Sequence, residues 1–180
     1  MELIETKVSS ELKYSGVIVD VTLDDARLVD GSMAKREVVH HPGGVGILPV
    51  DENGICYMVR QYRYPMGESV LEIPAGKLDR GEGHFNCAVR ELSEETGFTA
   101  DNYIYLGCFF PSPGYADEKI HVYLATGLHA GESHLDEGEF LNVEKISLDE
   151  LVQMVMDGRL VDAKTVIGVL KAKLYLDSEK

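Results

Sequence analysis

The stretch GKLDRGEGHFNCAVRELSEETGF, from Gly76 to Phe98, decides how this chain folds and where its chemistry lies. Its second half predicts a helix from about residue 83 to 96, which Gly97 ends as a C-terminal cap. At about 100° per residue, Glu94 and Glu95 fall one turn beyond Glu91, within an arc of roughly 100°. The stretch therefore predicts a helix with three carboxylates on one side.

The apolar residues of the same helix predict the side that packs on a core. They recur with the i, i+3, i+4, i+7 spacing of a buried helix face, and they border the acidic arc. The residues of this expected stripe are Phe85, Ala88, Val89 and Leu92.

The density of carboxylates on this helix calls for a compensating positive charge. Two carboxylates about 5 Å apart repel by roughly 3 kcal/mol at an effective dielectric near 20, and Arg90 supplies only one charge. Hard divalent cations such as Mg²⁺ bind carboxylate oxygens and usually share their ligand shell with substrate phosphates. The pattern therefore indicates a site for a metal and a phosphate, whereas the ordinary alternative is a charged helix held by Glu–Arg pairs.

The composition of the chain limits its class. With 180 residues, 44% apolar and 27% charged, it fits one globular domain with a small extension. Neither a run of 18 apolar residues nor a leader pattern is present, so we expect no membrane association. The formal net charge of -14 argues against nucleic-acid binding. Three widely spaced cysteines without a CxxC pair predict free thiols and a cytoplasmic location.

The remaining segments predict a mixed α/β fold. Residues 12–41 read as a small antiparallel sheet with a turn at Asp30-Gly31, and the run His41-Pro42-Gly43-Gly44 marks a boundary. We therefore expect an N-terminal β-sheet in residues 1–43 and a second domain in residues 44–180. Strands are predicted near 45–50, 55–62, 69–73, 103–110, 120–126 and 140–146. Helices are predicted at 147–156, opened by a capping box, and at 162–176.

The stretch from Gly76 to Phe98 resembles the Nudix hydrolase signature at every fixed position. That signature is a glycine, a glutamate six residues later and, after seven further residues, Arg-Glu-aliphatic-x-Glu-Glu-x-Gly followed by an apolar residue. With each residue type at roughly 5–7% usage, seven fixed identities match by chance far less than once in such a chain. The matching residues are Gly76, Glu82, Arg90, Glu91, Leu92, Glu94, Glu95, Gly97 and Phe98.

The resemblance implies a fold and a set of metal ligands. The expected fold is α/β, a Nudix-type α/β/α sandwich with a mixed sheet, plus the small N-terminal antiparallel β-sheet. It implies Mg²⁺ or Mn²⁺ as cofactor, with Glu82 and Arg90 supporting the ligands from outside the metal's own contacts. The implied ligands are the carbonyl of Ala75 and the carboxylates of Glu91, Glu94, Glu95 and Glu139.

Outside the signature, the chain resembles the ADP-ribose pyrophosphatase branch of this family. Pro113 stands fifteen residues after Phe98 within Ser112-Pro113-Gly114-Tyr115, and the likeness extends from about Arg36 to the last helix. Further shared stretches are Gln61-Tyr62-Arg63, Leu71–Gly76, Asp136–Phe140 and Asp162–Thr165. Neighbouring sugar-nucleotide hydrolases share several of them.

The branch implies a catalytic base on a loop away from the signature helix. Glu137 is our first choice for this general base, while Glu139 is an additional metal ligand or the alternative base, and Glu118 is the third candidate. Arg63 is expected to clamp the diphosphate, because guanidinium pairs bidentately with phosphate oxygens. The other expected substrate contacts are Arg36, Glu37, His41, Pro113 and Glu118.

The function that this resemblance implies is Mg²⁺-dependent hydrolysis of ADP-ribose to AMP and ribose 5-phosphate. Two alternatives stay open, namely a broader nucleoside diphosphate sugar pyrophosphatase and a nucleotide-sensing Nudix domain without turnover. The resemblance also implies a homodimer with exchanged N-terminal sheets. The chain has no tryptophan, although relatives stack the adenine between indoles, so the base selectivity is open.

Overall fold

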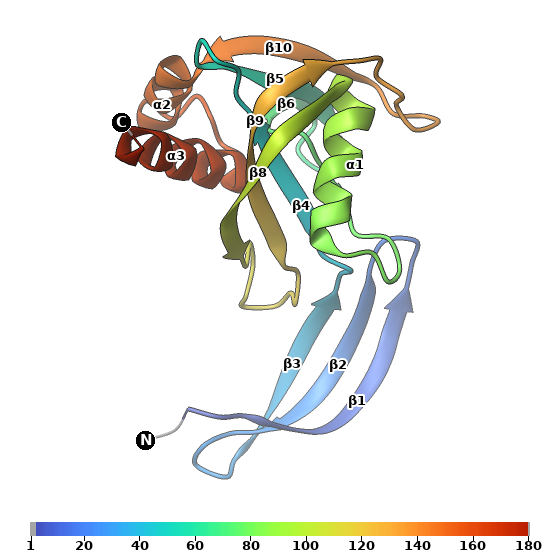
Figure 1. The fold of residues 1–180 in the computed structure, drawn as a ribbon. Coiled ribbons are helices and arrows are strands. Elements are labelled where there is room, and N and C mark those ends of the chain that lie inside the picture. The colour runs from blue at the N-terminus through green and yellow to red at the C-terminus, as the bar shows by residue number, and fades with distance from the viewer. Residues whose placement is uncertain (1–2, 180) are drawn as a thin grey trace. The chain divides into compact units, whose positions relative to one another are not determined.

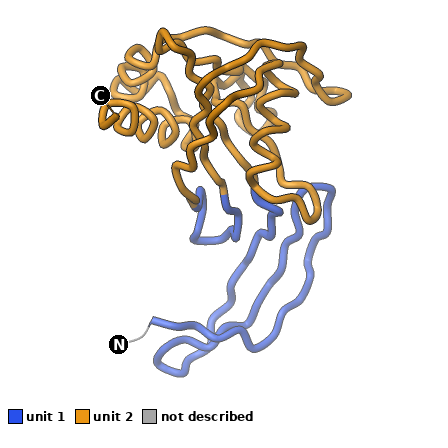
Figure 2. Tube along the Cα trace, in the orientation of Figure 1, with its two compact units in different colours: residues 1–43, 110–119 blue, residues 44–109, 120–180 orange. Residues whose placement is uncertain are grey.

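The computed structural model describes residues 3–179, which divide into two compact units (Figures 1 and 2). Unit 1 comprises residues up to Gly43 together with Phe110–Lys119, and unit 2 comprises Gly44–Phe109 and Ile120 onward. The segment 110–119, which the sequence assigned to the second domain, thus clusters with the N-terminal sheet. Within the described residues, no helix is long and apolar enough to cross a membrane.

Unit 1 contains a three-stranded antiparallel sheet in the order β1-β2-β3, where the sequence predicted a small antiparallel sheet without the number or order of its strands. The strands are β1 (Thr6–Ser15), β2 (Asp20–Arg27) and β3 (Met33–His40). Segment 110–119 joins the edge of β3, where Val39 N donates to Tyr115 O at 2.8 Å and Asp117 N donates to Val39 O at 3.1 Å. Every residue of β1 is exposed, and only Asp24 and Ala26 of this sheet are buried.

Unit 2 contains two sheets and three helices, an α/β/α sandwich with a mixed sheet as expected. One sheet has the order β10-β5-β6 and the other β7-β4-β9-β8, in which β4 and β9 are parallel. Its elements are β4 (Gly44–Pro49), β5 (Ile55–Arg63), β6 (Glu68–Glu72), β7 (Ala75–Lys77), α1 (His84–Thr96), β8 (Phe98–Phe109), β9 (Ile120–Ala130), β10 (Leu141–Ser147), α2 (Leu148–Met156) and α3 (Ala163–Ser178).

Alternation along the central strands places the two cores on opposite faces of the four-stranded sheet. Val45 and Ile47 of β4 pack with α1, whereas Leu48 belongs to the cluster that includes α2 and α3. The same alternation holds on β9, where Tyr123 faces α1 and Leu124 faces the other core. Successive side chains of a strand point to opposite faces of the sheet. Because both faces of β4 are buried, neither set of side chains is polar, which explains its near-continuous apolar sequence.

The structure corrects the predicted core face of α1. Phe85 is 48% exposed, and Val89 is only partly buried. The buried stripe instead contains Cys87, Ala88, Glu91, Leu92 and Glu95. Two of the three carboxylates therefore lie on the packed face of the helix, where the apolar pattern alone did not place them.

The helix ends at Gly97 and Ser147 follow the predicted capping residues, and Asp162 supplies a third cap that was not predicted. Gly97 adopts a left-handed φ of 74° after α1, and its N–H donates to Ser93 O at 2.9 Å. Ser147 caps α2 by accepting from Glu150 N at 3.2 Å. Asp162 caps α3 by accepting from Thr165 N at 3.0 Å. All three cysteines are free, with Cys56 and Cys87 buried and Cys108 exposed.

Candidate metal and diphosphate site

The site is built where α1 meets the short strand β7. Gly76 has no side chain, and a Cβ placed on it would lie 1.6 Å from Glu91 Oε1. Ala75 N donates to Glu95 Oε2 at 3.0 Å. The contact of Ala75 with the acidic helix therefore uses its N–H, whereas the sequence pointed to its carbonyl. Glycine at position 76 lets both buried carboxylates approach the backbone of residues 75–77.

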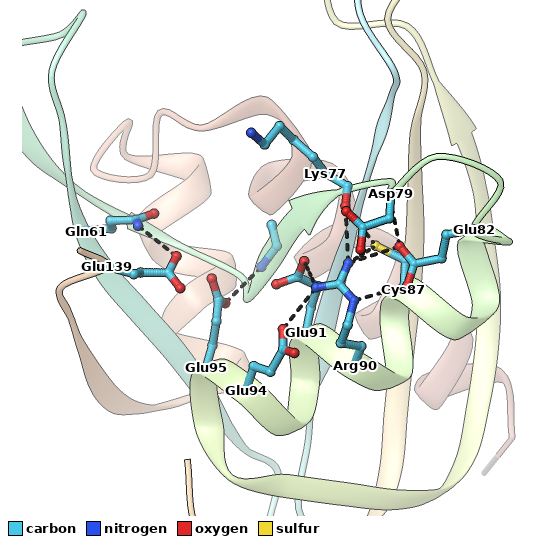
Figure 3. Close-up of polar contacts among 11 residues, drawn as sticks. Gln61, Lys77, Asp79, Glu82, Cys87, Arg90, Glu91, Glu94, Glu95 and Glu139 are labelled. Atoms are coloured by element: carbon cyan, nitrogen blue, oxygen red, sulfur yellow. Dashed lines mark hydrogen bonds and ion pairs between the residues drawn. The ribbon is translucent and has the colours of Figure 1, made fainter. Parts of the chain in front are cut away.

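Arg90 holds the outer part of the acidic group (Figure 3). Its Nη1 donates to Glu91 Oε1 at 2.7 Å and to Glu94 Oε2 at 2.9 Å. Its Nε and Nη2 each donate to a different oxygen of Glu82 at 3.0 Å. The hydrogen bond and charge of Arg90 lower the pKa of Glu82 to about 2. Arg90 thus links Glu91 and Glu94, and Glu82 in turn holds Arg90.

The loop before β10 brings a fifth carboxylate to this group. Gly131 N donates to Gly97 O at 2.7 Å and His134 N to Glu94 O at 3.0 Å, which ties the loop to the end of α1. Glu139 then accepts from Gln61 Nε2 at 3.1 Å (Figure 3). Glu137 is exposed on the same loop, and its side chain makes no hydrogen bond or ion pair with the other side chains of residues 3–179.

Burial gives the two inner carboxylates an unusual electrostatic state. Burial raises the pKa of Glu95 to about 8 despite the N–H of Ala75, and the charges of Glu91 and Glu139 add to the effect. Burial raises the pKa of Glu91 to about 7 despite Arg90, with a further contribution from Glu94. A buried carboxylate whose charge is not fully balanced resists ionisation, so a further cation here would be stabilised strongly.

The residues present fit a hard divalent cation. Their donors are carboxylate oxygens, and the glycine cradle at position 76 leaves the Glu91 carboxylate against the backbone. Within residues 3–179, however, no three acidic, His or Cys side chains converge into a ready-made metal cluster. The reason is visible in the contacts, because Arg90 engages Glu91 and Glu94 while Ala75 engages Glu95.

Arg63 lies in unit 2 but is engaged by a residue that the sequence analysis did not single out. Its Nε and Nη2 donate to Glu72 Oε1 and Oε2 at 2.6 and 2.7 Å, and Glu72 is 2% exposed. In the strand register, Glu68 lies opposite Arg63 and Glu72 lies opposite Val59. The side chains of Arg63 and Glu72 therefore meet along the length of the β5–β6 hairpin and not directly across it. A glutamate inside the apolar run Val70–Ile73 is the signal that could have revealed it, because buried charges are almost always paired.

The other predicted substrate contacts belong to unit 1. Arg36 makes a bidentate pair with Glu5, at 2.9 and 2.7 Å. His41 Nδ1 lies 3.3 Å from Glu118 Oε1 and also accepts from Gly43 N at 3.1 Å. Glu37 and Pro113 are exposed. Unit 1 thus brings His41 and Glu118 together, whereas the metal-site carboxylates all belong to unit 2.

A cavity of about 970 Å³ also lies within unit 2, but none of the predicted site residues lines it. Tyr57, Phe98 and Lys173 are among its walls. The cavity and the carboxylates of α1 are therefore separate features of unit 2.

Comparisons with known proteins establish the family. The NUDIX domain model matches residues 40–166, so the chain belongs to the Nudix family, whose hydrolases generally use divalent metal ions. The chain is 43% identical over 167 residues to a methanol dehydrogenase activator of Bacillus methanolicus, covering 92% of this chain and 90% of that protein. It is 40% identical over 180 residues to an ADP-ribose pyrophosphatase of Bacillus subtilis (strain 168), covering 98% and 97%.

A solved structure agrees with the fold. The crystal structure of an ADP compounds hydrolase superimposes with a TM-score of 0.86 and covers 99% of this chain and 98% of its own. Because the two sequences are only 22% identical, this likeness establishes the fold alone.

The raised pKa values of Glu91 and Glu95 predict how the metal-free protein responds to pH. An unfolded glutamate titrates near 4.5, whereas these two titrate near 7 and 8 in the fold. Between those limits the folded state keeps protons that the unfolded state has lost, so stability falls as pH rises. In chelator, we expect the Tm to decrease from pH 5.5 to pH 8, and added Mg²⁺ to raise it more at pH 8.

The matched control is the double variant Glu91→Gln/Glu95→Gln, which has neutral side chains of the same shape. Its Tm in chelator should change less between pH 5.5 and pH 8. An equal decrease in the variant and the unmodified protein, measured by differential scanning calorimetry, would assign the effect to other groups.

Proposed function

We propose that this protein is an ADP-ribose pyrophosphatase, which hydrolyses the diphosphate linkage of ADP-ribose to AMP and ribose 5-phosphate. The observation that carries the proposal is the 40% identity to an enzyme of that name along 97% of its length. The complete glutamate set of α1 supports it, because a domain that only senses nucleotides has no need of five carboxylates around one helix face. A broader activity on nucleoside diphosphate sugars is the second candidate.

The proposed cofactor is Mg²⁺, with Mn²⁺ as the alternative. When bound, it neutralises charge on the diphosphate oxygens that develops during cleavage. Its proposed ligands are Glu91, Glu94, Glu95, Glu139 and the carbonyl of Ala75. Glu139 is supported in this role by its position, because its charge acts on both Glu91 and Glu95. Arg90 and Glu82 orient the ligands from outside.

The remaining proposed roles are binding of the substrate and activation of the attacking water. Arg63 binds the diphosphate through the part of its guanidinium that Glu72 leaves open, because 39% of its side chain is exposed. Glu137 takes the proton from the attacking water as general base, with Glu139 and then Glu118 as the alternatives. Glu137 is exposed, so its loop must bring it to the substrate, whereas Glu139 already lies beside the helix carboxylates. Arg36, Glu37, His41 and Pro113 are proposed contacts to the nucleoside.

The proposed setting is the cytoplasm, which suits three free cysteines, and the proposed partner is a second copy of the chain. The support for the proposed dimer comes from the exposed sheet of unit 1. Three strands that bury only Asp24 and Ala26 lack a core of their own, and Val8, Leu12 and Tyr14 of β1 are each more than half exposed. In the proposed homodimer this sheet packs on the partner.

The substrate assignment predicts a clear order in a panel of nucleoside diphosphate derivatives. With Mg²⁺, ADP-ribose should have the highest kcat/KM among ADP-ribose, ADP-glucose and GDP-mannose, and its products should be AMP and ribose 5-phosphate. Chelator should abolish turnover, and Mg²⁺ or Mn²⁺ should restore it. Coupled phosphate release after phosphatase treatment measures the rate. A higher kcat/KM for GDP-mannose would favour the broader sugar-nucleotide hydrolase, and full activity in chelator would contradict the metal assignment.

The choice of base predicts opposite kinetic effects for two glutamates of one loop. If Glu137 activates water, Glu137→Gln should lower kcat by about 10²–10⁴-fold with little change in KM. Glu139→Gln should instead raise the Mg²⁺ concentration needed for half-maximal rate. Glu132→Gln, an exposed carboxylate of the same loop, is the control. A large loss of kcat at Glu139→Gln in saturating Mg²⁺, with none at Glu137→Gln, would move the base to Glu139.

The assembly proposal predicts a dimer that depends on unit 1. Analytical ultracentrifugation should give about twice the 19.9 kDa mass of one chain. Charged substitutions at the exposed apolar residues of β1, such as Leu12→Lys, should shift the protein toward monomer, because they place charge in the covered face. The control is Leu174→Lys, which is exposed on α3 in unit 2. A fully active monomer at working concentration would refute the exchange.

A further inference from the structure

We infer that Lys164 is a positioning residue for the diphosphate clamp, holding the guanidinium of Arg63 in a fixed direction through the buried carboxylate of Glu72. The inference rests on the proposed function, in which Arg63 binds the diphosphate. It adds a role for the first turn of α3, which carries neither a metal ligand nor a catalytic group.

The contacts form a chain of three charged groups. Glu72 Oε1 accepts from Arg63 Nε at 2.6 Å, and Oε2 accepts from Arg63 Nη2 at 2.7 Å. Lys164 Nζ donates to the same Oε2 and also lies 3.1 Å from Asp162 Oδ2. Glu72 and Lys164 are the inner members, with side chains 2% and 11% exposed. Both oxygens of Glu72 are therefore committed, and its carboxylate plane is fixed from two sides.

Arg63 is the outer member of this chain. Its side chain is 39% exposed, and Nη1 makes no hydrogen bond within residues 3–179. A guanidinium is rigid and planar, so an acceptor that holds Nε and Nη2 also sets where Nη1 points. Arg63 also lies close enough to Glu95 for their charges to interact. The guanidinium that carries these open N–H groups is thus near the acidic helix, where the proposed function places a diphosphate shared with the metal.

The backbone that carries Lys164 is itself fixed to the loop before β7. Thr165 is completely buried, and its Oγ1 donates to Asp162 Oδ2 at 2.6 Å and accepts from Ile73 N at 2.9 Å. Asp162 also accepts from Thr165 N, which caps α3. Lys164 therefore has little freedom to leave Glu72. Lys173 on the same helix contrasts with it, because that side chain is 30% exposed and pairs with Asp149 and Asp177.

A purely stabilising role explains this arrangement less well. One cation already balances Glu72, and a buried ion pair often stabilises no more than apolar residues of the same size. The second cation adds a constraint on direction, because it fixes the acceptor to which Arg63 is bound. If Lys164 acts by positioning Arg63, the rise in KM caused by losing Lys164 must depend on the presence of Arg63.

The test is a double-mutant cycle with Lys164→Met and Arg63→Ala. Lys164→Met alone should raise KM for ADP-ribose about tenfold and leave kcat within about twofold, because the clamp contacts the ground and transition states alike. In the Arg63→Ala background, the same substitution should raise KM no further. Lys164→Arg, which can still pair with Glu72, should recover part of the loss. Lys173→Met is the matched control and should retain the KM of the unmodified protein.

Thermal unfolding of each variant separates misfolding from misplacement. Should Lys164→Met fail to fold, Lys164→Gln takes its place in the cycle, since it removes the charge and is too short to keep the lysine's contact with Glu72, and the same dependence on Arg63 is expected. An unchanged KM, or a rise that adds in full to that of Arg63→Ala, overturns the inference while the proposed function stands. If the unmodified protein leaves ADP-ribose intact, the proposed function fails. The cycle is then measured by calorimetry as binding of inorganic pyrophosphate with Mg²⁺. Loss of affinity on Lys164→Met that disappears in the Arg63→Ala background supports the inference, and full additivity overturns it.

Discussion

The close approach of the Glu91 carboxylate to the backbone of Gly76 is the constraint on which the rest of unit 2 depends. A side chain at position 76 would overlap the carboxylate, so glycine is required wherever α1 packs this tightly on β7. The packing turns Glu91 and Glu95 toward the sheet and leaves Glu94 at the rim. The helix therefore buries negative charge on the face where most helices bury only apolar groups.

Buried charge must be balanced, and unit 2 balances it differently on the two sides of the β7 turn. On the helix side, one arginine serves three carboxylates, Glu95 relies on a backbone N–H, and the inner pKa values stay raised. On the hairpin side, burial would raise the pKa of Glu72, but the hydrogen bonds of Arg63 and the charge of Lys164 lower it. The helix side therefore has too little positive charge for its carboxylates, whereas on the hairpin side two cations face one buried carboxylate. A divalent cation fits the former, and a fixed, permanently charged clamp fits the latter.

In unit 1, besides the ion pairs within the sheet, polar contacts hold a loop against the edge of β3. His40 Nδ1 lies 2.6 Å from Asp117 Oδ2, His41 N donates to Asp117 Oδ1 at 3.0 Å, and His41 faces Glu118. These contacts fix segment 110–119 along the edge of β3, although about seventy residues separate the two stretches. The predicted nucleoside contacts all belong to this unit.

The sequence by itself determined the local elements and the family, because these depend on short-range order. The signature spacing, the Gly97 cap, the Ser147 cap and the apolar strands are all readable within a few residues. The α/β/α sandwich and the NUDIX match agree with that interpretation. The roles of Glu137 and Arg63 were assigned by likeness to a family, and they stay predictions.

Only the tertiary structure decided which face of α1 is buried, which residues accompany Arg63, and which loop glutamate lies beside the helix. The helical period allowed a stripe through Phe85 and Val89, but packing on β4 and β7 selected the stripe through Cys87, Glu91 and Glu95. Glu72 and Lys164 are ninety-two residues apart, and Gln61 and Glu139 seventy-eight. Periodicity reports the direction of a side chain within one element, whereas these pairings depend on how separate elements are packed, which no local pattern encodes.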